Sequence, residues 1–343
     1  MKIITGGYSE QGRPKYNEDR MQVKWLKKHT DYLFAAVFDG HGGEEAANYC
    51  IKRLADNLDS DDQFDTDLRA AITSAFIATD LKFLEKMEDS GATAVVALIH
   101  APTGKLWTAH CGDSRCVLSA NNGVAFQLTE DHKPTADEER ARIEAAGHDI
   151  IAETHLVNGK REKFYRIDGI IAVSRSIGDG DFKDNTSKGP EGQAITCVPD
   201  IGERQIEPTD EFLLIACDGL FDVMSNEDAI TFAANILRRT DDVSESKLKQ
   251  VAQQLTRHAV SLGSNDNVTA LIVHLNPVRG GASTFGDAPA ASMEGVARGS
   301  TAANDGKAAS GTQAASPEGI EEEGSDSDSD GPPPPPPPAA AAR

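Results

Sequence analysis

The sequence contains no long run of apolar residues, and this absence argues against a helical membrane span, which needs roughly 20 of them. Its first residues include neither the apolar segment of a secretory leader nor an acceptor glycine for myristoylation, so we expect a cytosolic or nuclear protein. Basic residues are scarce: 34 Lys and Arg stand against 55 Asp and Glu, for a net charge of -21. This balance argues against a nucleic acid or an anionic membrane as the partner, because either would require a basic surface.

Cysteine is also sparse and shows no metal-binding pattern. The cysteines are odd in number and irregularly spaced, and none forms a Cys-x-x-Cys pair or a cluster with histidine. We therefore expect reduced, mostly buried thiols rather than disulfides or structural zinc. The residues concerned are Cys50, Cys111, Cys116, Cys197 and Cys217.

Bulky apolar residues almost disappear towards the C-terminus. Gly, Ala, Ser, Asp and Glu dominate residues 278–343, which cannot bury enough apolar area to offset chain entropy. The sequence therefore predicts a folded domain over residues 1–277 and a disordered tail over residues 278–343. Within the tail, an acidic serine run (321–330) and a polyproline stretch (332–338) would solvate the chain. A more specific alternative is that a proline-binding module binds the stretch and an acid-directed kinase modifies Ser325, Ser327 and Ser329.

The apolar pattern of the first 277 residues predicts a mixture of strands and helices. Apolar runs of strand length occupy residues 20–26, 33–38, 93–99, 105–109, 115–119, 169–174, 212–217 and 268–274. Helical periodicity occupies residues 44–58, 66–87, 135–146, 226–239 and 246–262. Two helices come early and two come late as consecutive pairs. This order favours a segregated α+β architecture over a doubly wound parallel sheet.

Four acidic residues stand at the boundaries of these apolar runs. Asp39 and Asp218 each come directly after an apolar run and are followed by glycine. Asp113 comes shortly after the run at 105–109, and Asp266 precedes the run at 268–274. One Asp-Gly after a strand is also the commonest hairpin turn signal, so a single occurrence would prove nothing. The recurrence indicates a site for a hard metal ion, because oxygen ligands select Mg²⁺, Mn²⁺ or Ca²⁺ over zinc or copper.

A pair of such ions would suit chemistry at a phosphoryl group. Two ions can acidify a bridging water into a nucleophile and clamp the phosphoryl oxygens. Asp39 and Asp218 are the candidate inner ligands. Glu18 and Asp19 supply two more acids ahead of the strand at 20–26, although alone they would indicate only a solvated turn.

These residues lie within motifs that resemble the type 2C family of metal-dependent serine/threonine protein phosphatases. The matching segments are collinear with the family and extend from about residue 5 to residue 275. Any one of them is weak evidence, whereas eight in register are specific. They are Asn17-Glu18-Asp19, Phe38-Asp39-Gly40-His41-Gly42-Gly43, Ser90-Gly91-Ala92-Thr93-Ala94, Cys111-Gly112-Asp113-Ser114-Arg115, and the segments 128–134, 166–179, 210–222 and 264–269.

The resemblance implies a four-layer α-β-β-α sandwich, in which two antiparallel sheets are flanked by helix pairs and a metal centre lies at one end. It implies hydrolysis of phosphoserine and phosphothreonine in proteins by a water that bridges two Mg²⁺ or Mn²⁺ ions, with a third, weaker metal site nearby. The implied ligands of the pair are Glu18, Asp19 through a water, Asp39, the carbonyl of Gly40, Asp218 and Asp266. Those of the third site are Asp113 and Asp222.

The resemblance also implies roles in substrate binding and proton transfer. His41 would be the general acid that protonates the leaving serine or threonine oxygen. The family usually has a phosphate-binding arginine four residues before the acid equivalent to Glu18, but that position is Pro14 here. Arg13 is therefore the candidate for binding the substrate phosphate, and Arg20 is the alternative.

Residues 180–199 resemble the family's flap, a loop beside the active site, with a mobile surface loop as the alternative. Lys183 and Lys188 within it are candidates for contact with acidic phosphopeptides. A pseudophosphatase that only binds partners is a second hypothesis, but it predicts lost metal ligands, and every expected carboxylate is present. A two-metal nuclease is a third, against which the net charge argues. We expect a monomer that acts on phosphorylated proteins.

Overall fold

The computed structural model describes residues 1–276, apart from residues 87–88, 122, 158–159 and 240–242. The predicted tail, with its acidic serine run and polyproline stretch, lies outside the described residues. Within the described part, no helix is long and apolar enough to cross a membrane.

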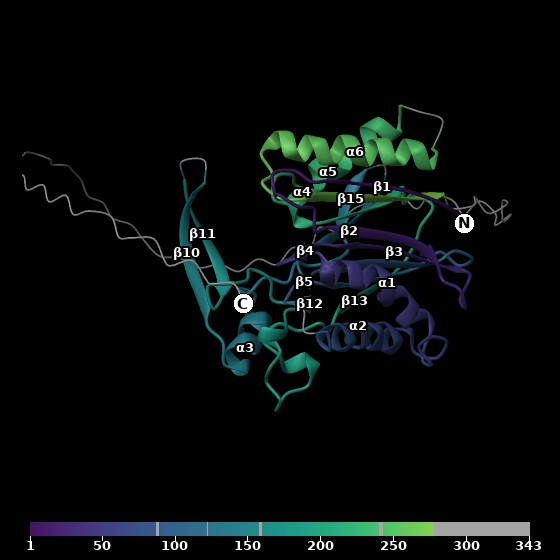
Figure 1. Ribbon diagram of the computed structural model, residues 1–343. Coiled ribbons are helices and arrows are strands. Elements are labelled where there is room, and N and C mark those ends of the chain that lie inside the picture. The colour runs from purple at the N-terminus through teal and green to yellow at the C-terminus, as the bar shows by residue number, and fades with distance from the viewer. Residues whose placement is uncertain (87–88, 122, 158–159, 240–242, 277–343) are drawn as a thin grey trace, which may run out of the picture. The chain divides into compact units, whose positions relative to one another are not determined.

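Two five-stranded antiparallel sheets lie face to face (Figure 1). The β6 sheet has the order β13 (Asp200–Gln205), β7 (Lys105–Cys111), β6 (Ala94–His100), β3 (Tyr32–Phe38), β2 (Arg20–Trp25). The β14 sheet has the order β1 (Lys2–Glu10), β15 (Val268–Asn276), β14 (Phe212–Ala216), β8 (Arg115–Ala120), β9 (Val124–Gln127). Side chains from both sheets form one buried cluster between them.

Helices cover the outer face of each sheet and complete four layers (Figure 1). Helices α1 (Glu45–Asp59) and α2 (Leu68–Leu84) pack against the β6 sheet. Helices α4 (Asp218–Phe221), α5 (Asn226–Leu237) and α6 (Glu245–Leu262) pack against the β14 sheet. The predicted α-β-β-α sandwich is confirmed, and so are the five predicted helices, α3 included, within a few residues at each end.

Strand β3 shows why this chain forms a sandwich. Successive side chains of a strand point to opposite faces. Leu33, Ala35 and Val37 lie in the cluster between the sheets, whereas Phe34 and Phe38 lie in the cluster under α1 and α2. A strand that is buried on both faces must be apolar throughout, and each buried phenylalanine contributes about 1.5–3 kcal/mol relative to an exposed one.

A long insertion joins β9 to β13 and carries its own small core. It contains α3 (Asp137–Ala146), the hairpin of β10 (Ile150–Val157) and β11 (Lys160–Ile167), and two 3₁₀ turns (Gly180–Phe182 and Pro190–Gly192).

The strand predicted over residues 169–174 is wrong. Asp168 and Gly169 have φ values of 51° and 74°, which turn the chain, and the segment after this turn pairs only through one isolated bridge at Ile171.

A small three-stranded sheet brings three distant segments together. Its order is β12 (Ile177–Gly178), β5 (Gly91–Ala92), β4 (Gly40–His41), and His41 pairs directly with Gly91. This sheet fixes the backbone of His41 immediately beyond the end of β3.

Candidate active site

The acids predicted to bind metal meet at one end of the sandwich. In antiparallel sheets the C-terminal ends of β3 and β7 lie at the same edge, and the C-terminal end of β14 lies beside the start of β15. A cavity of about 1090 Å³ opens there. His41 and a set of acidic residues contribute to its lining; the acids are Glu18, Asp39, Asp89, Asp113, Asp179, Asp181, Asp218, Asp222 and Asp266.

Asp19 lies beneath the cavity rather than in its lining. The residue is 3% exposed, and neither of its carboxylate oxygens has a hydrogen-bond partner. Ligand atoms of Asp19, Asp39 and Cys217 lie within 4.8 Å of one another. Burial is the main cause that raises the pKa of Asp19 to about 6. A buried carboxylate without a partner is costly, and a cation or a water held by a cation would satisfy it.

The carboxylates raise one another's pKa values. Burial raises the pKa of Asp39 well above its usual value, and the charges of Asp19 and Asp218 raise it further. Burial and the charges of Asp113 and Asp222 act in the same direction on the pKa of Asp218. The pKa of Asp222 is also raised, mainly by burial. Such a cluster of oxygen ligands fits divalent cations, whose charge would restore the ionised state.

Asn267 positions two of the predicted ligands. Its side-chain oxygen accepts a hydrogen bond from the Glu18 backbone N–H at 2.8 Å. Its amide nitrogen donates to the carbonyls of Gln11 and Tyr16 at 2.7 and 3.0 Å. Asn267, which directly follows Asp266, therefore ties the loop that precedes Glu18 to the segment that contains Asp266. No sequence argument assigned it this role.

A close backbone approach explains the glycine that follows Asp39. A Cβ atom at Gly40 would lie 2.5 Å from the carbonyl oxygen of Glu18. Glycine is required there so that the two ligand-bearing segments can meet. Thr93 holds Asp39 in place, because the Thr93 N–H donates to the carbonyl of Asp39 at 2.9 Å. The Thr93 hydroxyl in turn contacts the hydroxyl of Ser114 at 2.7 Å.

Asp113 is paired with a cation that the sequence did not assign a role. The ammonium of Lys133 contacts Asp113 Oδ2 at the cavity wall. Burial acts to lower the pKa of Lys133, but the charge and hydrogen bond of Asp113, together with the charges of Asp218 and Asp131, outweigh burial, and the net shift is upward. The positive charge beside Asp113 and near Asp218 therefore stays in place at neutral pH.

His41 is oriented by an aspartate far away in the sequence. Its Nε2 lies 2.9 and 2.8 Å from the two carboxylate oxygens of Asp179. Burial acts to lower the pKa of His41, but the charge and hydrogen bond of Asp179, together with the charges of Asp113 and Glu18, outweigh it, and the net shift is upward. Asp179 also accepts a hydrogen bond from the hydroxyl of Ser176. The imidazole is thus held at the cavity with its protonated form favoured.

A buried ion pair secures the segment that contains Asp179. Lys183 Nζ lies 2.6 Å from Asp80 Oδ1 on α2, and both side chains are less than 5% exposed. Asp80 also accepts from the Gly178 N–H at 2.8 Å. The expected contact of Lys183 with acidic phosphopeptides is therefore wrong, because its ammonium is buried in this pair. Lys188 is exposed.

The structure does not place Arg13 or Arg20 in the cavity lining. The exposed Arg13 guanidinium donates to Asn265 Oδ1, next to Asp266. Arg20 donates to the carbonyls of Asn17 and Asp19 at 2.9 and 2.8 Å, and so supports the loop instead of facing a substrate. The phosphate-binding role predicted for Arg13 stays a prediction that this geometry does not support. Lys133 and Arg166 line the cavity, and Lys183 borders it with its ammonium buried in the pair with Asp80.

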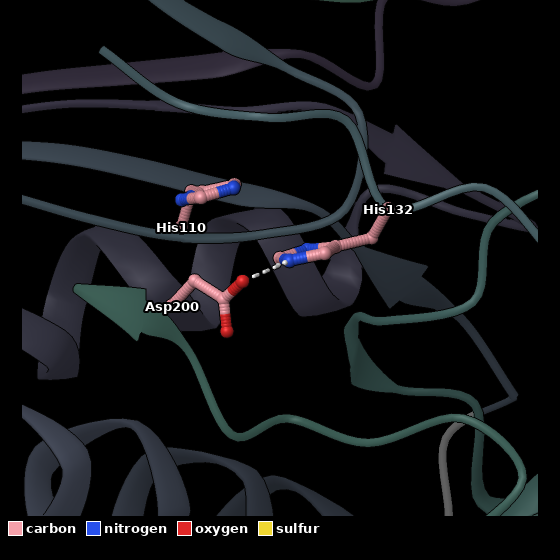
Figure 2. Close-up of side chains that lie close together, drawn as sticks. All are labelled: His110, His132 and Asp200. Carbon is pink, nitrogen blue, oxygen red and sulfur yellow. Dashed lines mark hydrogen bonds and ion pairs between the residues drawn. The ribbon is translucent and has the colours of Figure 1, made fainter. Parts of the chain in front are cut away.

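His110, His132 and Asp200 form a separate cluster (Figure 2). His132 Nδ1 accepts from the Gly112 N–H at 3.2 Å, so its proton is on Nε2, which donates to Asp200 Oδ2 at 3.1 Å. Both nitrogens of His132 are engaged and no lone pair is free for a metal. The geometry therefore fits a hydrogen-bonded link that orients Gly112 next to Asp113.

The comparison with protein families agrees with this site. The model of the family "Protein phosphatase 2C" matches residues 6–268. "Probable protein phosphatase 2C 55" of Oryza sativa subsp. japonica is 36% identical over 281 residues, which are 80% of this chain and 66% of the relative. "Protein phosphatase 2C homolog 2" of Saccharomyces cerevisiae is 36% identical over 258 residues, which are 73% of this chain and 53% of the relative. The chain thus matches slightly less than two thirds of the first and about half of the second.

Solved structures agree on the fold. A crystal structure of a phosphatase from Toxoplasma gondii superposes with a TM-score of 0.66 at 25% identity and covers 79% of this chain and 94% of that chain. A structure of a sex-determining protein from C. elegans superposes with a TM-score of 0.64 at 25% identity and covers 80% and 65%, respectively.

Proposed function

Because the chain belongs to the protein phosphatase 2C family, we propose that it is a metal-dependent phosphatase that hydrolyses phosphoserine and phosphothreonine in proteins. The observation that supports this best is the acidic cavity itself. Its carboxylates raise one another's pKa values, and Asp19 beneath it has no hydrogen-bond partner. The same cavity contains a histidine held by an aspartate.

The chain's own residues divide into ligands and supports. The ligands of two divalent cations, Mg²⁺ or Mn²⁺, would be Glu18, Asp39, the carbonyl of Gly40, Asp218 and Asp266, with Asp19 beneath them. Asp113 and Asp222 would form a weaker third site. When bound, the cations would neutralise the phosphoryl oxygens and acidify the attacking water. Asn267 and Thr93 hold the segments that contain these ligands.

His41 would give a proton to the leaving oxygen. A serine or threonine alkoxide is a poor leaving group, and a positioned general acid typically contributes about 10²–10⁴-fold to its departure. Asp179 favours the protonated imidazole that this role requires. An aryl phosphate has a leaving group that needs no proton, so the two substrate types separate the role of His41 from a general effect on the site.

The experiment compares a phosphothreonine peptide with an aryl phosphate, using EDTA-treated protein with Mn²⁺ or Mg²⁺ added back. We expect hydrolysis of both only with metal. We expect His41→Ala to slow peptide hydrolysis by about 10²-fold or more, with a much smaller loss on the aryl phosphate. The matched control is His258→Ala on α6, which should leave both rates unchanged.

Two results would contradict the proposal. Equal losses on both substrates would remove His41 from the general-acid role. A folded protein without activity in either metal would favour the alternative of a pseudophosphatase that binds partners. The other expected carboxylates line the cavity and Asp19 lies close to Asp39, and the presence of the whole set argues against that alternative.

A further inference from the structure

One face of the β10–β11 hairpin displays cations without any carboxylate among its described residues. The register pairs Ala152 with Tyr165 and Thr154 with Lys163, and Arg161 lies two residues further along the same face. All five of these residues are exposed. Within the described part of the chain, neither Arg161 nor Lys163 forms an ion pair. Their charges are therefore available to a group from outside.

The opposite face of the same hairpin forms part of the catalytic cavity. Phe164 and Arg166 line the cavity, and they alternate along β11 with Lys163 and Tyr165. Adjacent residues of a strand are about 3.4 Å apart along its axis. A polypeptide that holds a phosphorylated residue in the cavity and then crosses the edge of the hairpin would reach the cationic face, because the two faces alternate residue by residue along β11.

The charge of this strand contrasts with that of the whole chain. The chain has a net charge of -21, yet residues 160–166 contain four basic residues and one acidic residue. Two exposed cations are too few for a nucleic acid or an anionic membrane, which require an extended basic surface. Arg161 and Lys163 are enough to bind a short acidic segment. Each exposed ion pair with such a segment contributes modestly to the binding free energy, and its contribution depends on the salt concentration.

We propose that the outer face of the β10–β11 hairpin binds an acidic segment that flanks the phosphorylated residue of the substrate protein. Arg161 and Lys163 supply the charge, and the shared wall of the cavity brings the segment to them. The proposal rests on the proposed phosphatase function and adds to it the class of substrate that is preferred.

The test uses phosphothreonine peptides that are flanked on both sides by glutamate, by serine or by lysine. The double variant Arg161→Gln/Lys163→Gln is compared with Lys52→Gln/Arg53→Gln, which removes one lysine and one arginine from the exposed surface of α1. We expect the hairpin variant to lower kcat/KM for the glutamate peptide about three- to tenfold, chiefly through KM. The serine peptide should change little and the lysine peptide should improve. The α1 variant should alter none of these ratios.

The effect should also depend on salt. At about 1 M salt the Debye length is about 3 Å, so the difference between wild type and the hairpin variant should disappear. An unchanged preference in the hairpin variant would overturn the proposal. Equal losses on all three peptides would overturn it too, because the hairpin would then shape the cavity without sensing charge.

Binding separates this proposal from the proposed function. Fluorescence anisotropy of the labelled glutamate peptide, measured in EDTA, reports binding without turnover. If no substrate is hydrolysed with any metal but the hairpin variant still binds the glutamate peptide more weakly than wild type does, the docking face stands and the phosphatase function fails. If peptides are hydrolysed without any charge preference, the function stands and the docking face is refuted.

Discussion

His110 makes the stability of this protein depend on pH in a way that can be measured. Its Nε2 donates to the carbonyl of Glu130 at 2.6 Å, and its Nδ1 is buried without a partner. The ring stacks on His132 with a centroid separation of 4.5 Å. Burial, followed by the neighbouring His132, lowers the pKa of His110 to about 4. The unfolded chain therefore binds a proton at His110 more readily than the folded state does.

The size of the effect follows from that shift. The unfolded pKa of histidine is near 6.5, so the shift is about 2.5 units, or at most about 3.4 kcal/mol. Between the two pKa values the unfolded state binds more protons, so the free energy of unfolding falls as the pH falls from about 6.5 and levels off below about 4. When the pH falls from about 7 to about 4.5, the protonation of His110 in the unfolded state lowers the free energy of unfolding by about 2 kcal/mol.

The assay is urea unfolding, followed by circular dichroism in EDTA across this pH range, for wild type and His110→Gln. Glutamine can keep the hydrogen bond to Glu130 but has no proton to gain. The buried carboxylates titrate in both proteins, so the difference between the two curves isolates His110. We expect the wild type to lose about 2 kcal/mol more than the variant on acidification, whereas His258→Gln should follow the wild type. Parallel curves for wild type and His110→Gln would refute the reasoning.

Three further perturbations test other parts of the structure. Asp218→Asn should remove most metal-dependent activity but raise the melting temperature in EDTA, because it relieves repulsion among buried carboxylates; a lower melting temperature with full activity would contradict the metal assignment. Lys183→Met should lower the free energy of unfolding by about 3–5 kcal/mol, because it leaves Asp80 buried and unpaired; a loss below about 1 kcal/mol in urea unfolding would show that the pair is unimportant. Deletion of residues 278–343 should change kcat/KM by less than about twofold in a phosphopeptide assay, and a large loss would place the tail in the enzyme.

The apolar pattern was sufficient for most of the fold. Strands buried on both faces must be apolar throughout, and helices repeat with a different period, so the two patterns can be separated along the chain. Strand β1 escaped detection because Gly6 and Gly7 interrupt its apolar pattern. A side chain at Gly6 would collide with the backbone of α6, so the glycine exists for packing and not for the strand itself. The β10–β11 hairpin also escaped, since its alternating charged residues resemble a loop.

The acids of the site could be predicted because each stands next to a strand, and antiparallel pairing brings such ends together. The residues that support them could not. Asp179 lies 138 residues from His41, and Asn267 lies 249 residues from Glu18. A local pattern contains no information on contacts at such separations. The role of Arg13, which follows only from the family's usual arginine position before the acid equivalent to Glu18, stays a prediction, and its guanidinium here donates to Asn265.

The sequence by itself determined a segregated α+β architecture and several carboxylates at strand ends, since these follow from local apolar periods and from neighbouring residues. The four layers, the full ligand set and the role of His41 followed only from the collinear motifs that resemble the family. Only the tertiary structure decided which partner orients His41, that Lys183 is buried instead of exposed, and that the hairpin turns one face to the cavity and its cations outward. Those features depend on how the insertion packs against α2 and the ends of both sheets. The packing of distant segments depends on their complementary shapes and on the surface they bury together, and the local sequence of one segment does not specify either.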